Sequence, residues 1–353
     1  MNSSTQFLRR LTLAVVGSCA ALIATPLLAQ TTATTDPVGF ITLNVAGTGG
    51  VGTNKISFEG FGLTRAVEYQ GSAETVGANF VVDNDATWTD NQFNGAAGAY
   101  YLEVSSGTGA GTTYDITGTV AATKRINLAQ NLAAGVANGA SFKIRKHWTL
   151  SAAFGPANSA GLQGGDDSTT ADQVLIWNGS GYNTYYYQVA APALGGTGWR
   201  SASDTFADAG GQVIYPDDGV IVKRIASTAV NVVLMGAVKT GQTSFPITPG
   251  INIIANVYAA PMTLASCGLQ ASGITGGDDP TTADQVQIWT GSGYNTYYYQ
   301  VAAPALGGTG WRSASDTFTD AGSTSIPVGS SIVVKRLFGP AFDWKLPQHP
   351  ATI

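Results

Sequence analysis

One stretch of this chain occurs twice, and it constrains the fold more than any other feature of the sequence. Residues 161–210 and 273–322 align at a constant offset of 112, with six differences among fifty positions. The offset continues past this stretch, because residues 222–224 and 334–336 are both Val-Lys-Arg. Repetition at this spacing indicates one structural unit used twice. The chain is therefore predicted to contain two copies of one module, which favours assembly or multivalent binding over catalysis.

The N-terminus has the three parts of an export signal. Arg9 and Arg10 precede an apolar run over residues 11–28, and Ala29 ends a plausible cleavage site. We predict a signal peptide over residues 1–29 and an exported protein of the periplasm, the outer surface or the extracellular space. No later apolar run is long enough for a transmembrane helix.

The mature chain is mildly acidic and sparsely charged. Without the two leader arginines, 15 basic and 22 acidic residues remain, a net charge of −7. This balance gives no electrostatic footprint for nucleic acid. Cys19 lies in the leader, so Cys267 is the one cysteine of the mature chain and no intrachain disulfide is expected. Cys267 is predicted to be a small buried residue.

Short alternating segments separated by glycine, asparagine and aspartate turns predict an all-β chain. Residues 38–45 alternate in the way of a half-buried strand, and residues 182–188 follow an Asn-Gly-Ser-Gly hairpin turn. Such spacing indicates several small sandwich or barrel modules. Helical turns are expected only near residues 126–135, after Thr149 and after Thr263.

The repeat and the two threonine-capped turns set the predicted domain boundaries. We expect an N-terminal β domain over residues 30–147, a first β repeat module over 148–261 and a second over 262–353. The two modules are thus predicted to be near-identical, and to follow the N-terminal domain along the chain.

Three motifs resemble those of a family of uncharacterised exported proteins found mainly in verrucomicrobial bacteria. They are DPVGFIT at residues 36–42, HWTL at 147–150, and YNTYYY followed by GWR over residues 182–200. The resemblance covers nearly the whole mature chain. It implies secretion and a β-rich fold, with no assigned activity and no functional residues to carry over.

Aromatic and arginine side chains recur in both copies of the repeat. They could form a flat face suited to a glycan or a protein partner, because aromatic rings stack on such ligands and arginine donates two hydrogen bonds. The alternative is that they pack in the core or fill cross-strand positions. The candidates are Tyr185, Tyr187, Trp199, Arg200, Tyr297, Tyr299, Trp311 and Arg312.

Each repeat also carries a Gly-Gly-Asp-Asp turn. Clustered carboxylates are hard oxygen ligands that could hold Ca²⁺, although the pattern is not that of an EF-hand. The alternative is a turn in which aspartates accept hydrogen bonds from local backbone N–H groups. A third cluster is Asp83-Asn84-Asp85 with Asp90. The candidate calcium ligands in the repeats are Asp166, Asp167, Asp172, Asp278, Asp279 and Asp284.

Catalytic patterns are scarce. The two histidines, His147 and His349, are far apart in sequence, and no glutamate follows Glu103. A hydrolase would therefore depend on aspartates, such as Asp167 with Asp204. Residues 47–52 match G-x-G-x-x-G, but the segment that follows reads as a strand, whereas a dinucleotide site needs a helix there.

Together these features predict an exported, non-catalytic structural or adhesive protein that associates with itself or with a surface glycan or protein. No cofactor other than calcium is suggested by the residues. The alternative function is carbohydrate binding, with or without calcium, and the third is a secreted hydrolase. Two linked modules would raise avidity without new contacts.

Overall fold

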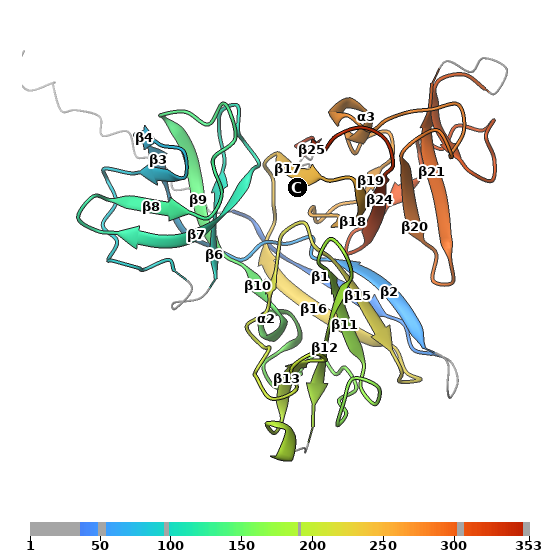
Figure 1. Cartoon of the computed structure of the whole chain (residues 1–353), viewed down its shortest axis with the longest axis horizontal. Helices are drawn as coiled ribbons and strands as arrows, with labels where there is room; N and C mark the ends of the chain where they lie inside the picture. Colours follow the sequence, from blue (N-terminus) through green and yellow to red (C-terminus); the bar gives the residue numbers. More distant parts are fainter. Residues whose placement is uncertain (1–35, 49–53, 95–98, 190–191, 302–306, 349–353) are drawn as a thin grey trace, which may run out of the picture. The chain divides into compact units, whose positions relative to one another are not determined.

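A computed structural model describes residues 36–48, 54–94, 99–189, 192–301 and 307–348 (Figure 1). These residues belong to one compact unit, Asp36–Ile353. The predicted signal peptide, His349 and most of the glycine-rich turn at residues 47–52 lie outside the described residues. The prediction of an all-β chain is confirmed, because open antiparallel sheets account for nearly all the regular structure. No helix among the described residues is both long enough and apolar enough to span a membrane.

The first module combines the start of the mature chain with the first repeat. One five-stranded sheet has the order β13-β12-β11-β15-β2, and β1 pairs with β16 in a separate two-stranded ribbon. A third, short sheet joins β10 to β14. The elements are β1 (Val38–Val45), β2 (Lys55–Gly60), β10 (Trp148–Thr149), α2 (Leu150–Phe154), β11 (Gln173–Trp177), β12 (Tyr182–Gln188), η2 (Pro192–Leu194), β13 (Gly198–Ser201), β14 (Val213–Ile214), β15 (Gly219–Arg224) and β16 (Val230–Ala237).

The second module repeats this arrangement in an uninterrupted segment. Its five-stranded sheet has the order β18-β24-β20-β21-β22, β17 pairs with β25, and β19 pairs with β23. Every strand pair of the first module therefore has a counterpart in the second. The elements are β17 (Thr243–Ile247), β18 (Gly250–Ala255), β19 (Met262–Thr263), α3 (Leu269–Ser272), β20 (Gln285–Trp289), β21 (Tyr294–Gln300), β22 (Gly310–Ser313), β23 (Ser325–Ile326), β24 (Ser331–Arg336) and β25 (Phe342–Leu346).

A separate β domain is inserted into the first module between β2 and β10. Its seven strands form one sheet in the order β3-β9-β6-β7-β8-β5-β4. It has its own buried cluster, which includes Leu102, Ile126 and Ile144. The strands are β3 (Val67–Ala73), β4 (Thr75–Val76), β5 (Phe80–Val82), β6 (Tyr100–Val104), β7 (Thr113–Val120), β8 (Arg125–Leu128) and β9 (Ala140–Lys146).

Buried ion pairs connect the inserted domain to the first module's flanking segments. Glu103 accepts hydrogen bonds from Arg145 at 3.0 Å and from Lys239. Burial opposes ionisation of Glu103, but the two cations outweigh it and hold the pKa of Glu103 below its usual value. Arg145 also pairs with Asp36, two residues before β1. The inserted domain is thus fastened at both the start and the end of the first module.

Strand pairing groups the residues differently from the predicted boundaries. β1 and β2 pair with β16 and β15, so Val38–Val45 and Lys55–Gly60 share their sheets with the first repeat and not with the N-terminal domain. Likewise β17 and β18 pair with β25 and β24 of the second repeat. The predicted boundaries at residues 147/148 and 261/262 therefore separate strands that pair with each other.

The core of the first module lies between its five-stranded sheet and the β1–β16 ribbon. Leu43 and Val232 on the ribbon belong to the same buried cluster as Val174 and Val222 on the sheet. Alternation explains this, because every second residue of each strand points to the same face. The second module has a corresponding cluster, in which Trp344 occupies the position of Val232.

The two modules contact one another through pairs of matching interactions. Trp177 donates its indole N–H to the carbonyl oxygen of Ile251 at 2.9 Å, and Trp289, its repeat counterpart, donates to Ile56 at 2.9 Å. Backbone bridges join Glu59 to Ser330 and, in the counterpart strands, Asp218 to Ile254. A buried cluster of Phe58, Ile221, Ile253 and Val333 fills the contact. The copies thus use each other as partners across an approximate two-fold axis.

The predicted helical turns had different outcomes. The helix after Thr149 is confirmed, since the Thr149 hydroxyl oxygen accepts a hydrogen bond from the Ala152 N–H at 3.2 Å. Its counterpart begins later, because residues after Thr263 form a turn and α3 starts beyond Gly268. The helical turn expected near residues 126–135 is wrong. Its first residues belong to β8, where Ile126 is fully buried.

Candidate functional site

The predicted aromatic face lies in the interior. Seven of its eight residues are buried and Tyr299 is half-buried. In the first module, Tyr187 and Trp199 pack edge to face with ring centres 5.5 Å apart. Both belong to the core cluster, so packing, the alternative reading, is the one confirmed. The residues that were predicted to form an exposed binding face, and do not, are Tyr185, Tyr187, Trp199, Arg200, Tyr297, Tyr299, Trp311 and Arg312.

The second half of the tyrosine strand, residues 185–188, is buried on both faces because the chain covers its second face with its own loop. Tyr186 is fully buried, and its hydroxyl donates to the Gln188 side chain at 3.0 Å. Gln188 donates in turn to the carbonyl of Gly196 at 2.9 Å, and Arg200 donates to Gly195 at 2.6 Å. The same bonds recur in the second copy through Gln300 and Arg312. The expected external partner of this face is therefore a loop of the same module.

Two of the predicted calcium ligands are buried in ion pairs. Asp172 pairs with Arg224, and Asp284 pairs with Arg336. Asp172 also accepts hydrogen bonds from the backbone N–H groups of Gln163 at 2.6 Å and Ile225 at 2.8 Å. With Asp172 and Asp284 at 1% and 0% exposure, these carboxylates fix the loop to β15 and β24 and face no solvent.

The remaining aspartates of the two turns do not converge. Asp167 accepts hydrogen bonds from Thr169 and Thr170, which lower its pKa, and Asp279 is bonded in the same way. These are the local turn bonds of the alternative reading. Asp166 and Asp278 stay in the same turns, and among the described residues neither belongs to a group of three acidic, histidine or cysteine side chains whose atoms lie within 4.8 Å.

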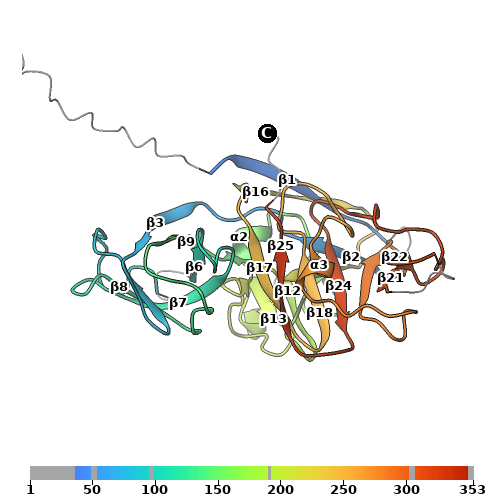
Figure 2. The same ribbon diagram turned by 90° about the horizontal axis from the view of Figure 1, so that it is seen from above.

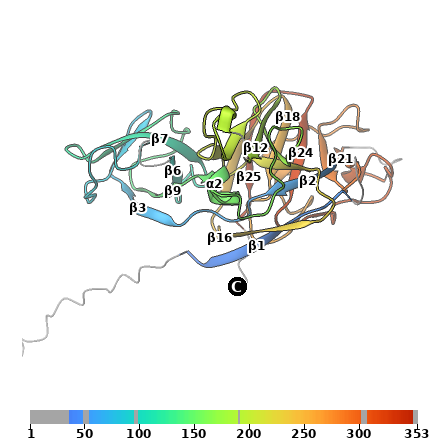
Figure 3. The same cartoon turned by 90° about the horizontal axis from the view of Figure 1, so that it is seen from below.

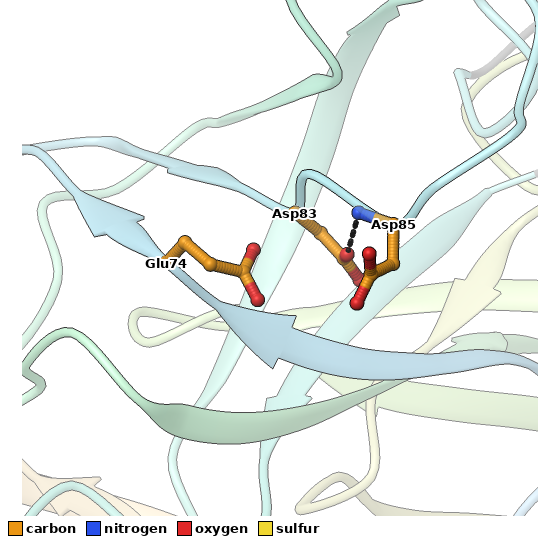
Figure 4. A group of neighbouring side chains, drawn as sticks. All are labelled: Glu74, Asp83 and Asp85. Atoms are coloured by element: carbon orange, nitrogen blue, oxygen red, sulfur yellow. Dashed lines mark hydrogen bonds between the residues drawn. The ribbon is translucent and has the colours of Figure 1, made fainter.

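One acidic group does meet that distance, in the inserted domain. Figure 4 shows Glu74, Asp83 and Asp85, of which the last two were predicted as a cluster with Asp90. Asp83 accepts a hydrogen bond from the Tyr69 hydroxyl at 2.6 Å and one from the Asp85 N–H at 3.0 Å. Glu74 accepts one from the Asn84 N–H. These bonds hold the turn between β5 and the following loop. Asp90 instead accepts from Ala121.

His147 is buried directly after β9, and its neighbours are an aspartate and two tyrosines. Its Nε2 lies 2.9 Å from an Asp115 carboxylate oxygen, and its ring packs on Tyr101 and Tyr215. Asp167 and Asp204 each accept backbone hydrogen bonds within their own turns. No catalytic arrangement is built from these residues in the part of the chain that the structure describes.

An exposed apolar surface lies on the β1–β16 ribbon, defined as Val38–Val45 and Val230–Ala237. Figures 2 and 3 show the two strands running side by side. On the outer face, Phe40 and Met235 stand directly opposite each other and are both 71% exposed. Val38 is 80% exposed and Val233 is 56% exposed. None of the 16 residues of the two strands is charged, and the polar residues of the exposed face are Thr42, Asn44 and Asn231.

The same face of the second module is polar. By strand register and the repeat offset, Val233 corresponds to Lys345 and Asn231 to Asp343. Asn44 corresponds to Pro246. Charges and proline are the features by which natural sheets avoid association. The second module therefore carries these protective residues and the first does not. The sequence analysis did not identify this difference between the modules, although the lack of charged residues in β1 and β16 can be seen in the sequence.

A polar hollow of about 400 Å³ lies where the inserted domain meets the two modules. Burial, and then the charge of Asp217, raise the pKa of Asp218 above its usual value. Tyr215 exposes 43% of its surface at the rim. Other lining residues are Asp115, Gln130, Asn131, Asp217, Ser244 and Asp343.

No protein-family model, curated protein or solved structure is detectably similar to this chain. The family resemblance drawn from its motifs stays a prediction.

Proposed function

We propose that this chain is an exported, non-catalytic structural or adhesive subunit that associates with copies of itself. The observation that carries the proposal is the uncharged β1–β16 ribbon with its exposed Val38, Phe40, Val233 and Met235. Apolar side chains grouped on one exposed face are a feature of interaction sites. The leader sequence supports export to the periplasm, the outer surface or the extracellular space.

The exposed apolar surface belongs to the first module, and the corresponding face of the second module carries charges and proline. The repeats already cover their tyrosine strands with their own loops and pack on each other through matched contacts. Duplication therefore builds a rigid pair and leaves one open ribbon for each chain. Assembly through this ribbon needs no ligand, no metal and no turnover.

We expect the mature protein to assemble as its concentration rises, measured by size-exclusion chromatography with light scattering. Val233→Lys, which copies Lys345 of the second module, should weaken assembly by at least about tenfold, because a desolvated unpaired charge is costly. Ala207→Lys adds the same charge at an exposed position that already differs between the repeats, and it should assemble like the wild type. A strict monomer at every concentration, with calcium and with chelator, would contradict the proposal.

The hollow favours carbohydrate binding as a second candidate function. Carboxyl, amide and hydroxyl groups line it, and Tyr215 offers an exposed ring. Such a lining matches the hydroxyl groups and apolar ring face of a sugar. Among the described residues, its aspartates do not belong to a group of three close acidic, histidine or cysteine side chains.

A glycan array followed by calorimetry with the best oligosaccharide tests this second function. Tyr215→Ala should weaken binding by about tenfold or more, because the exposed ring is lost. Tyr182→Ala is the matched control, since Tyr182 is equally exposed, at 44%, but lies outside the hollow. Equal losses in both variants would remove the hollow as the site.

A further inference from the structure

The edge of β1 opposite β16 is open for hydrogen bonding. Ala237, the partner of Val38, exchanges both of its backbone hydrogen bonds with Thr64 on the far side of β16, at 2.8 and 2.9 Å. In an antiparallel pair, backbone groups of successive residues point to alternate edges. The N–H and C=O groups of Val38, Phe40, Thr42 and Asn44 therefore point away from β16. Within the described residues, no partner bonds to them.

The second module shows what this edge does when it has a neighbour. Ser244, the counterpart of Thr42, donates its backbone N–H to the carbonyl oxygen of Gly111 in the inserted domain at 3.1 Å. Two residues later, Pro246 removes the next outward N–H. The chain thus blocks this edge in the second module by two means. Neither operates at Thr42 or Asn44, and the open part of the edge ends there, because the next outward N–H, that of Ala46, donates to the Ser57 side chain of β2 at 3.4 Å.

We infer that this edge pairs antiparallel with β1 of a second copy of the chain, giving a continuous four-stranded sheet in the order β16-β1-β1-β16. This inference rests on the proposed function and adds an edge contact through β1 to the packing of the apolar outer faces, which Val233→Lys tests. An antiparallel pair of identical strands is self-complementary about a two-fold axis, so each copy satisfies the other's edge.

The charge distribution allows two copies to meet at this ribbon. The mature chain carries a net charge of −7, so copies repel each other over most of their surface. The β1–β16 ribbon has no charge to add to that repulsion. Edge pairing also places Phe40 and Met235 of both copies on the same face, because a strand pair keeps its outer faces on one side of the sheet. The apolar surface of the pair is therefore continuous across the contact.

Asn44→Pro in the full mature chain tests the inference. It copies Pro246, so the fold already accommodates proline at this position, and it removes one outward N–H from each copy. We expect the dissociation constant from sedimentation velocity to rise by at least about tenfold, because the symmetric contact loses the bond twice. Asn44→Ala is the matched control. It loses the same side-chain bond to Asn231 but keeps the N–H, and should change the constant by no more than about threefold.

Cross-linking provides a second readout that does not depend on proline. Phe40→Cys and Thr42→Cys place a thiol on the exposed strand, while the native Cys267 is buried and gives no background. With a short thiol cross-linker, at least one variant should form covalent dimers, and the wild type should form none. A partner other than a second copy would leave both variants uncross-linked.

The outcomes separate the inference from the proposed function. If the protein assembles, Val233→Lys disrupts assembly and Asn44→Pro does not, the outer faces stack and the edge pairing is overturned while the proposed function stands. If the wild type is monomeric throughout, both are overturned. Loss of assembly in Asn44→Pro but not in Asn44→Ala, together with covalent dimers, supports edge pairing.

Discussion

Asp172→Asn is expected to lower the free energy of unfolding by about 3–5 kcal/mol, because it leaves the buried Arg224 guanidinium without its counter-charge. The Asp172 carboxylate also accepts backbone hydrogen bonds from Gln163 and Ile225, which the amide of asparagine can replace only in part. A loss of this size should be visible as a shift in the chemical denaturation curve followed by tryptophan fluorescence.

Asp166→Asn is the control for Asp172→Asn. Asp166 lies in the same Gly-Gly-Asp-Asp turn but is exposed, so its replacement should change stability by no more than about 0.5 kcal/mol. Adding Arg224→Met to Asp172→Asn should recover part of the loss, since the buried charge is then removed. Similar small effects in Asp166→Asn and Asp172→Asn, with a calcium-dependent melting temperature, would instead support the predicted metal site.

Local strand structure was predictable because it depends on neighbouring residues. Residues 182–188 are rich in tyrosine and follow a glycine-containing hairpin turn, and they form β12. The short helix after Thr149 was predictable for the same reason, since Thr149 and Gly155 directly flank its five residues in the sequence. Such signals need no knowledge of distant contacts.

The division into modules was not predictable from the repeat. β2 reads Lys-Ile-Ser-Phe-Glu-Gly and its counterpart β18 reads Gly-Ile-Asn-Ile-Ile-Ala, so their equivalence is not visible by residue identity. The inserted domain also places β2 and its partner β15 far apart in the chain. Local periodicity predicts a strand but not its partner, and so the boundaries followed the near-identical stretch alone.

The predictions of an exposed aromatic face and of a calcium ligand at Asp172 were wrong for a related reason. The tyrosines of β12 alternate between two faces, and sequence alone could not show that the loop carrying Gly195 and Gly196 folds back over the second face. The buried Asp172 carried no local signal to separate it from the exposed Asp166. In both cases a contact with residues outside the motif decides whether the side chain meets solvent.

Glu59→Ile is expected to stabilise the protein, and to do so more at high pH. Glu59 is buried, with 6% exposure, at the position where the second module has the core residue Ile254. Burial raises the pKa of Glu59 from 4.5 to about 8. The folded chain therefore holds this proton more tightly than the unfolded chain does. By linkage, the wild type loses stability as pH rises from about 4.5 to about 8.

The size of the Glu59 effect follows from the same shift. Each unit of pKa is worth about 1.4 kcal/mol, which sets an upper limit of about 5 kcal/mol, and we expect Glu59→Ile to gain roughly 2–4 kcal/mol at pH 9. At pH 4 or below, where the carboxyl is protonated in both states, the gain should shrink to the difference in packing. Denaturation curves of both proteins between pH 4 and pH 9 measure this difference directly.

Glu68→Gln provides the matched control for Glu59→Ile, because Glu68 is an exposed glutamate whose contact with Lys146 is 3.8 Å long. Its stability should follow that of the wild type at every pH. Taking the difference between Glu59→Ile and the wild type removes the contribution of other groups that titrate in this range, including Asp218. A difference that does not change with pH would show that the Glu59 carboxyl has the same pKa in the folded and unfolded chain, so that burial does not raise it.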